Sequence, residues 1–259
     1  MKTTEDIVND SGYPLQIRIE KWIEETSGQH RWQVAAKEHR WINSETGDEG
    51  YIDLVLEREG RNLRLVVECK RIIGSWTFLV PMIQPVHDEE FKSLLVDYQN
   101  FSFAWKKFPL APASPEASFC VMETGGKKDS RIIESLAGEL LLSLEQLAIQ
   151  ETNLVRPHIE NLNRSSQHML YLPVIVTTAT LQTMNFNPSD IEIANGKVTQ
   201  STVGEVEFIR FRKNLASHVD YQKPKMYTLK DLNRENDRSI LVVQAESFIK
   251  FLSMLQAYL

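Results

Sequence analysis

Apolar residues first recur at helical spacing near the start of the chain. Residues 11–14 read Ser-Gly-Tyr-Pro, a typical start signal, because proline fits the first turn of a helix. The repeat ends at Ser27 and Gly28, and its positions are Leu15, Ile19, Trp22, Ile23 and Thr26. The pattern predicts a helix whose buried stripe is flanked by Gln16 and Glu20, which lie side by side because they are four residues apart.

Alternating apolar and polar residues then predict three strands, over residues 31–42, 50–57 and 61–71. The turn at 58–60, Arg-Glu-Gly, is short enough to join the last two strands as a hairpin. A helix followed by three consecutive strands is therefore the first unit of the predicted fold.

Three polar side chains are predicted to meet on one face of this hairpin. Successive side chains of a strand point to opposite faces, so Glu68 and Lys70 share a face and Cys69 points to the apolar side. Asp53 lies on the face of the second strand opposite its apolar residues, which are Ile52, Leu54 and Leu56. Asp53, Glu68 and Lys70 can therefore converge.

The rest of the chain alternates between helical and strand patterns. Segment 88–107 predicts a helix, and the leucine-rich segment 129–151 predicts a helix that lies between layers. A final helix from Glu246 has an apolar face that fits core packing, with a dimer interface as the second interpretation. Further strands are predicted at 117–123, 169–178 and 240–243. The order indicates a mixed α/β fold, and no Gly/Ser linker divides it.

The composition is that of a globular protein and excludes several classes of function. Of the 259 residues, 42% are hydrophobic and 25% are charged, which is enough to bury a full core. The formal charge of -6 argues against tight non-specific adhesion to nucleic acid, so DNA or RNA would have to be held by local basic patches. The six histidines lack metal-ligand spacing, and no zinc-protease or serine-hydrolase motif occurs.

The beginning of the chain and its cysteines favour a soluble, cytoplasmic protein without a membrane partner. Residues 1–6 contain no apolar signal core, and no window approaches the roughly 18 apolar residues of a membrane helix. The two cysteines, Cys69 and Cys120, both lie in apolar runs, as packed thiols do in a reducing compartment.

Asp53, Glu68 and Lys70 offer the groups that metal-assisted hydrolysis needs. Two carboxylates can share one Mg²⁺, which prefers oxygen ligands and keeps several waters, and Mn²⁺ could take its place. The backbone carbonyl of Cys69 could add an oxygen ligand. Such a metal polarises a phosphodiester and activates water, while Lys70 could orient that water or neutralise charge in the transition state.

In these residues the chain resembles the PD-(D/E)xK phosphodiesterases, the restriction-endonuclease-like superfamily. Ile52-Asp53 matches the aspartate of the family's second strand, and Glu68-Cys69-Lys70 matches the acidic-x-Lys motif of its third strand. The resemblance covers residues 12–71 well and extends to about residue 123. It implies an α/β restriction-endonuclease-like core of helix, three-stranded meander, helix and strand in residues 1–125, with residues 126–259 as an α/β extension packed on it in one compact unit.

The resemblance also implies an activity and residue roles. Asp53 and Glu68 would hold the metal and Lys70 would assist the water in a Mg²⁺-dependent nuclease that cleaves DNA, or alternatively RNA, and leaves a 5′ phosphate. Many bacterial members carry a glutamate on the first helix, where this chain has Gln16. A third acidic contribution must therefore come from Glu20 or be absent. Ile52 also stands where the name-giving proline is expected.

Two basic clusters are candidates for gripping nucleic acid. The first stands at the start of the leucine-rich helix and consists of Lys127, Lys128 and Arg131. The second follows one strand, with two guanidinium groups on one face, and consists of Arg210, Arg212 and Lys213. A solvated basic turn and ion pairs with nearby acids are the simpler interpretations of the two clusters.

Two other functions stay open at this point. A nuclease-fold binding or scaffolding module that has lost catalysis would agree with Gln16 and with the acidic net charge. An α/β interaction protein would carry Asp53 and Glu68 as solvated salt-bridge partners on an open sheet face, too far apart to share a cation. The bare acidic-x-Lys pattern does not decide, because it recurs at Glu90-Phe91-Lys92 without a preceding aspartate-bearing strand.

Overall fold

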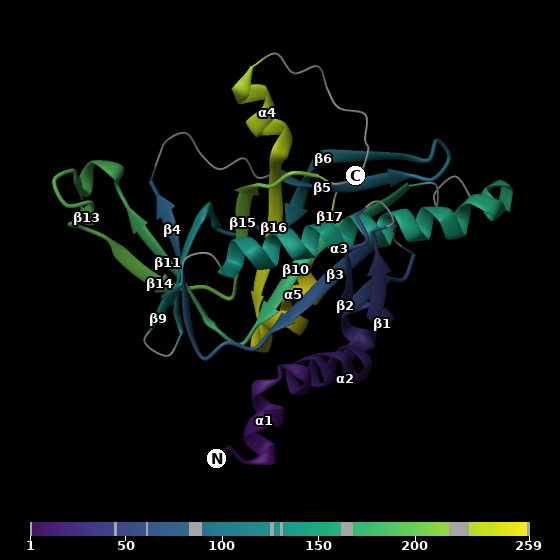
Figure 1. Ribbon diagram of the computed structural model, residues 1–259, viewed down its shortest axis with the longest axis horizontal. Coiled ribbons are helices and arrows are strands. Elements are labelled where there is room, and N and C mark those ends of the chain that lie inside the picture. The colour runs from purple at the N-terminus through teal and green to yellow at the C-terminus, as the bar shows by residue number, and fades with distance from the viewer. Residues whose placement is uncertain are drawn as a thin grey trace.

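The computed structural model describes residues 2–43, 46–60, 62–82, 90–124, 127–129, 132–161, 168–217 and 228–257. These residues form a mixed α/β structure in which helices cover both faces of a large mixed sheet (Figure 1). The helices are α1 (Thr4–Asp10), α2 (Tyr13–His30), α3 (Ile132–Val155), α4 (Leu229–Asn236) and α5 (Phe248–Met254). Short 3-10 helices cover Arg156–Asn161, Pro188–Asp190 and Ala245–Ser247.

Within the described residues the large sheet has ten strands, and its main path runs β1-β2-β3-β10-β16-β15-β7. Strand β5 also pairs with β10 and with β6, and β6 pairs with β17. The strands of this sheet are β1 (Trp32–Ile42), β2 (Glu49–Arg58), β3 (Leu63–Lys70), β5 (Glu90–Asp97), β6 (Ser102–Ala111), β7 (Glu116–Ala117), β10 (His168–Thr177), β15 (Phe208–Asn214), β16 (Asp237–Gln244) and β17 (Gln256–Ala257).

Strands β1, β2 and β3 form an antiparallel meander, and β10 lies beside β3 in parallel. The parallel ladder pairs Ile175 with Glu68 and Thr177 with Lys70. A parallel neighbour needs a crossover connection, and here the chain between β3 and β10 contains part of a second sheet, the β5–β6 hairpin and finally α3. The sheet thus joins strands from both sides of residue 125.

Two apolar cores lie on the two faces of the large sheet. Helices α2 and α5 cover one face, where Ile19, Ile23 and Phe251 pack against the strands. Helix α3 crosses the other face (Figure 1), and its buried leucines are Leu136, Leu140, Leu141, Leu144 and Leu147. The leucine-rich segment therefore lies between layers, as its sequence predicts.

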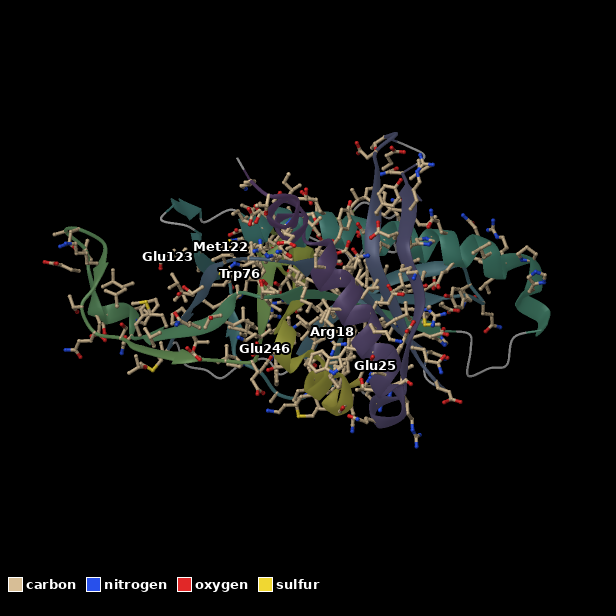
Figure 2. The ribbon with its side chains drawn as sticks, turned by 90° about the horizontal axis from the view of Figure 1, so that it is seen from below. Arg18, Glu25, Trp76, Met122, Glu123 and Glu246 are labelled. Atoms are coloured by element: carbon tan, nitrogen blue, oxygen red, sulfur yellow. The ribbon has the colours of Figure 1, made fainter. Side chains whose placement is uncertain are left out.

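A second sheet lies beside the first, and its order is β14-β11-β4-β8-β9. Its strands are β4 (Gly74–Pro81), β8 (Phe119–Thr124), β9 (Lys127–Asp129), β11 (Thr180–Phe186) and β14 (Thr202–Glu205), and a small ribbon is formed by β12 (Ile191–Glu192) and β13 (Lys197–Val198). Trp76 and Met122 are cross-strand neighbours in this sheet and fully buried (Figure 2). They connect the second sheet to the core beneath α3.

Most of the predicted elements near the start of the chain are confirmed. Helix α2 begins at Tyr13, after Gly12 in a left-handed conformation and with proline in its first turn, and it ends at His30. The three predicted strands correspond to β1, β2 and β3. The terminal helix is also present, and its apolar residues Phe248, Phe251, Leu252 and Leu255 are buried in the core, as the first of its two interpretations states.

The helix predicted for residues 88–107 is wrong. Over the described part of that segment the chain forms the hairpin β5–β6, in which Leu94 pairs with Trp105 and also with Tyr171 of β10. Aromatic and branched side chains in this segment suit a pleated, buried sheet, and pairing with β10 outweighs the helical spacing. In chain order, the helix that follows the meander is therefore α3, and the strand after that helix is β10, which lies beside β3.

One smaller prediction also fails beside the polar residues of β2. Ile52 packs in the core beneath α3 together with Val55, whereas Leu54 belongs to the opposite core. The simple alternation of a strand is therefore interrupted at Asp53, where the ladder between β2 and β3 ends.

Both cysteines are buried free thiols, in agreement with the sequence. Among the described helices, none is long and apolar enough to cross a membrane.

Candidate functional site

Asp53 and Glu68 lie near each other on neighbouring strands. The ladder between β2 and β3 ends at the pair Leu54 and Val67, one residue short of both acids, and the Asp53 carboxylate is close enough to raise the pKa of Glu68. Oδ2 of Asp53 accepts a hydrogen bond of 2.7 Å from the backbone N–H of Cys69. The structure thus brings the aspartate of β2 against the acidic-x-Lys segment of β3.

Cys69 turns its backbone toward Asp53 and its side chain away from it. The N–H and C=O of one strand residue point to the same side, so the Cys69 carbonyl also faces β2. Its thiol packs in the core beneath α2, where burial raises the thiol pKa well above its usual value. The Cys69 thiol therefore contributes to core packing. The Cys69 backbone carbonyl points toward β2, as its predicted role as an oxygen ligand of the metal requires.

The two carboxylates are partly buried and destabilise each other's charge. Burial raises the pKa of Glu68 to about 7, the Asp53 carboxylate adds to the rise, and Lys70 opposes it. Burial also raises the pKa of Asp53, with a further contribution from Glu38, while the Cys69 N–H and Lys70 oppose the rise. Lys70 is therefore close enough to act on both groups, and one cation does not balance their charge.

Helix α2 places its two candidate residues differently. Gln16 is buried at 7% exposure, and its Nε2 donates hydrogen bonds to Oε1 of Glu38 and, at 3.2 Å, to the backbone oxygen of Asp53. Glu20 instead pairs with Nζ of Lys37 at 2.7 Å. The structure joins Gln16 to the site and holds Glu20 in an ion pair beside β1.

Glu38 is a residue of this site that sequence reasoning missed. The ladder between β1 and β2 pairs Lys37 with Leu54 and His39 with Ile52, so Glu38 faces Asp53 from the other side. In the sequence Glu38 stands among charged residues of an edge strand, which usually form a solvated face. The spacing offers no signal, because the register depends on a bulge between Val34 and Ala36. We call Gln16, Glu38, Asp53, Glu68 and Lys70 the carboxylate site.

The donors of the carboxylate site fit a hard divalent cation. They are carboxylate and carbonyl oxygens, and Asp53 uses only Oδ2 in its hydrogen bond to Cys69. Among the residues that the structure describes, no group of three or more His, Cys, Asp or Glu side chains is placed so that it could hold a metal ion. Mg²⁺ does not require three such side chains, since it is usually held by one or two carboxylates together with waters and substrate phosphates.

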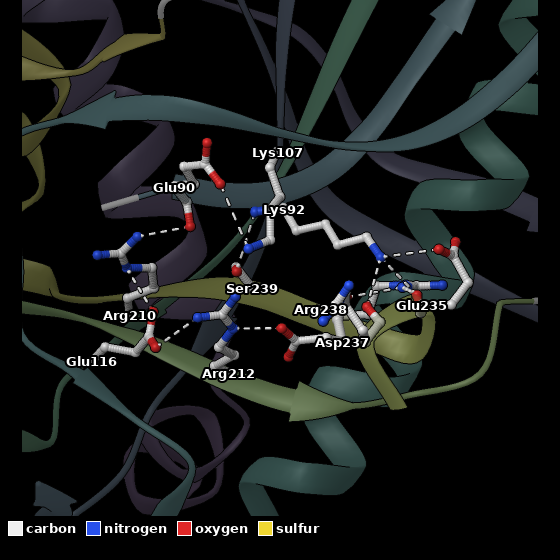
Figure 3. A network of polar contacts seen from close by, with 11 residues as sticks. Glu90, Lys92, Lys107, Glu116, Arg210, Arg212, Glu235, Asp237, Arg238 and Ser239 are labelled. Carbon is white, nitrogen blue, oxygen red and sulfur yellow. Dashed lines mark hydrogen bonds and ion pairs between the residues drawn. The ribbon is translucent and has the colours of Figure 1, made fainter. Parts of the chain in front are cut away.

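The basic residues of β15 lie in a network of ion pairs (Figure 3). Arg210 is 5% exposed and pairs with Glu116 at 3.3 Å, while Arg212 contacts Glu116 at 3.0 Å and Asp237 at 2.6 Å. These contacts favour the ion-pair interpretation of this cluster over a nucleic-acid surface. We call the ion-pair network the residues Glu90, Lys92, Lys107, Glu116, Arg210, Arg212, Glu235, Asp237 and Arg238.

Lys213, the third candidate of that cluster, is also engaged. Its Nζ pairs with Glu134 at 3.0 Å and donates to the backbone oxygen of Ser118 at 3.2 Å. A recess of about 430 Å³ opens beside it and is lined by Ser118, Phe119, Arg212, Lys213, Asn214, Asn233, Arg234 and Asp237. Because Arg212 and Lys213 already pair with carboxylates, the fold compensates their charge within this recess.

The basic cluster at residues 127–131 differs from its predicted place. Lys127 and Lys128 lie in β9, which pairs with β8, and α3 begins only at Ile132. The sequence predicts a helix start at these lysines because the leucine repeat begins next to them. In the structure the segment instead pairs with β8 as a strand. Arg131 and the side chains of Lys127 and Lys128 lie outside what the structure describes.

Comparison with family models, with curated proteins and with solved structures finds no match to this chain. The function is therefore argued from the geometry above.

Proposed function

We propose that this chain is a divalent-metal-dependent nuclease with a restriction-endonuclease-like core. Asp53 and Glu68 hold Mg²⁺, or Mn²⁺ in its place, and Lys70 assists the attacking water. The observation that carries the proposal is the hydrogen bond from the Cys69 N–H to Asp53, which holds the aspartate of β2 against the Glu68-Cys69-Lys70 segment of β3 where their ladder ends.

The topology around these residues supports the proposed core. Helix α2, the meander β1–β3, helix α3 and strand β10 follow in chain order, and β10 is parallel to β3. The resemblance implies a helix, a meander, a helix and a strand, and this order agrees with it, with strands β4, β8 and β9 of the second sheet and the β5–β6 hairpin inserted before α3.

The electrostatics of the carboxylate site support metal binding better than a structural salt bridge. On the same hairpin Glu57 faces Arg64, and the two ion-pair at 2.6 Å, as expected of cross-strand charges that stabilise a sheet. Asp53 instead lies near Glu68 and raises the pKa of that carboxyl, so the two negative charges destabilise each other. A bound divalent cation would turn this repulsion into shared ligation.

The residues of the site divide the chemistry of hydrolysis among them. When bound, the cation supplies polarisation of the phosphodiester and activation of water. Asp53 is held in place by the Cys69 N–H and presents its other oxygen to the ligand. Lys70 shares the face of Glu68, where its ammonium group donates to the attacking water or to a phosphate oxygen and offsets the negative charge of the transition state.

A cleavage assay tests the proposal. The full chain is incubated with fluorescently labelled single- and double-stranded DNA and with RNA, in Mg²⁺, Mn²⁺ or EDTA. We expect cleavage that requires the metal and falls by about 100-fold or more in Asp53→Asn, Glu68→Gln and Lys70→Met. Glu57→Gln, on the same strand and with Arg64 as its partner, is the matched control and should keep wild-type activity. Thermal unfolding shows that each variant is folded.

A catalytically inactive nucleic-acid-binding or scaffolding module is the second candidate, favoured by the neutral Gln16 on α2. It predicts nucleic-acid binding that the three substitutions hardly change and no cleavage under any metal condition. That result would replace the first proposal, and metal-dependent cleavage that survives all three substitutions would move the active site elsewhere.

A further inference from the structure

The chain that follows Lys70 is longer than the chain that runs beside it. Strands β3 and β10 are parallel up to the pair Lys70 and Thr177, and the same two chain segments pair again as β4 and β11 of the second sheet, from Ser75 and Thr180 onward (Figure 1). Four residues, 71–74, separate the two ladders on the first segment, and only two residues separate them on the second. The segment directly after Lys70 therefore contains two residues more than a regular ladder could pair.

Thr178, on the neighbouring segment, holds this extra length of chain. Its backbone N–H donates to the carbonyl oxygen of Lys70 at 3.2 Å. Its hydroxyl accepts a hydrogen bond of 2.9 Å from the N–H of Ile72 and donates one of 2.8 Å to the carbonyl oxygen of Ile72. A threonine hydroxyl has one donor and two acceptor sites, so it can serve both backbone groups of one residue, as a neighbouring strand would. Thr178 therefore fixes the backbone on both sides of Arg71.

The place of the Lys70 ammonium group depends on this backbone. Among the described residues, no hydrogen bond or ion pair holds its Nζ, although Lys70 is close enough to act on the pKa values of Asp53 and Glu68. A lysine side chain has a flexible four-carbon stem, so its reach is set by its backbone and by whatever binds its ammonium group. The backbone is thus the part of Lys70 that the fold itself fixes.

We infer that Thr178 is a positioning residue for Lys70, acting through the backbone of residues 70–72. This inference rests on the proposed function. Hydrolysis depends on the exact placement of its groups, and a misplacement of about 1 Å can lower a rate by about 100-fold. Loss of the Thr178 hydroxyl would release Ile72 and let the end of the Lys70 segment shift, while the ladder between β3 and β10 stays paired.

Steady-state cleavage kinetics of the full chain test the inference. The labelled nucleic acid that the wild type cleaves in Mg²⁺ is the substrate for Thr178→Val, which keeps the shape of the side chain without its hydroxyl, and for Thr178→Ser, which keeps the hydroxyl. We expect Thr178→Val to lower kcat by about 10-fold or more and to leave KM within about twofold of the wild type, because an interaction that matters in the transition state is lost. Thr178→Ser should recover kcat to within about threefold.

Thr77→Val is the matched control for these variants. It removes a hydroxyl bond of 3.4 Å to Gln182 within the second sheet, away from the segment after Lys70, and should keep wild-type kinetics. Thr178 is exposed, so water can replace the bonds that its hydroxyl loses and the variants should fold. Thermal unfolding of each variant checks this.

A double variant shows whether Thr178 acts through Lys70. If it does, Thr178→Val slows the residual cleavage of Lys70→Met by less than about twofold, because the group that it positions is already gone. A loss as large in the Lys70→Met background as in the wild type contradicts the inference, and so does a loss in Thr178→Val that Thr178→Ser shares.

The same assays distinguish failure of the inference from failure of the proposed function. Wild-type kinetics in Thr178→Val, with cleavage lost in Lys70→Met, remove the role of Thr178 and leave the nuclease proposal standing. A wild-type chain that cleaves none of the labelled substrates in Mg²⁺ or Mn²⁺ overturns both. A Lys70→Met variant that cleaves at the wild-type rate overturns the role of Lys70 and the inference with it.

Discussion

The carboxylate site and the ion-pair network both contain several charged side chains. They differ in the balance between positive and negative charge. The network combines Lys92, Lys107, Arg210, Arg212 and Arg238 with four acids, and its cations contact carboxylates or backbone oxygens. In the carboxylate site the three acids Glu38, Asp53 and Glu68 lie near a single lysine, Lys70. Partnered charges stabilise a fold, whereas a local excess of one sign raises the energy of the empty site and favours a ligand of the opposite sign.

The pKa values follow this difference. Burial alone would lower the pKa of Arg212, but Glu116 and Asp237 raise it, so the network holds this guanidinium charged. In the carboxylate site burial and Asp53 together raise the pKa of Glu68 to about 7. At Arg212 the neighbouring acids offset the effect of burial on the charged form. At Glu68 the neighbouring carboxylate adds to that effect.

Removal of an acid should have opposite effects in the two regions, and the largest effect is expected in the network. Glu116→Gln removes the carboxylate that the buried guanidinium groups of Arg210 and Arg212 share, while Arg212 keeps Asp237 and Arg210 keeps the backbone oxygen of Glu90. We expect a loss of about 3 kcal/mol in the free energy of unfolding, measured by urea denaturation, because removing one member of a buried ion pair leaves its partner's charge less well compensated.

Glu90→Gln is the matched control for that substitution. Glu90 pairs with Lys107 at 3.5 Å at the exposed end of the network, and such pairs contribute about 1 kcal/mol or less. Equal losses in the two variants would show that the burial of Glu116 has no special effect.

Glu68→Gln should instead stabilise the protein when divalent cations are absent. The pKa of Glu68 is raised from 4.5 to about 7, so the folded protein holds this proton more tightly than the unfolded chain does. The resulting stability is complete below the unfolded value and is lost as the pH rises through about 7. Between about pH 4.5 and pH 8, the unfolding free energy of the wild type should fall by up to about 3 kcal/mol relative to Glu68→Gln. Parallel stability curves for the two proteins would rule out this repulsion.

Lys92 is an exception within the network, because the acids near it offset the effect of its burial only in part. Its Nζ donates to the backbone oxygens of Arg234 and Glu235 at the end of α4, and burial lowers its pKa to about 8 although Glu235 opposes the shift. Because the folded pKa lies below the unfolded value of 10.5, the stability linked to Lys92 is present above 10.5 and lost as the pH falls through 8.

The wild type should therefore gain about 2 kcal/mol relative to Lys92→Met between about pH 7.5 and pH 10. Urea denaturation of both proteins measures this difference, in which the tyrosines common to both cancel. An NMR titration of Lys92 with a midpoint near its ordinary value would contradict it.

The sequence by itself determined the elements whose pattern is local. Proline after Gly12 and the apolar repeat that follows specify α2, and the alternation of residues 63–70 sets Glu68 and Lys70 on one face of β3. The leucines of α3 specify a helix between layers in the same way. Each of these patterns lies within one continuous segment of the chain. The geometry of a single helix or strand is therefore enough to predict the element from it.

Only the tertiary structure decided which distant segments face each other. The helix predicted at 88–107 became β5 and β6 because β10 offered a partner, and Arg210 became a buried ion-pair residue because Glu116 lies on the neighbouring strand. Glu38 reached Asp53 through a register that a single bulge shifts. Pairing energies between strands far apart in the chain set these contacts, and no short stretch of sequence contains them.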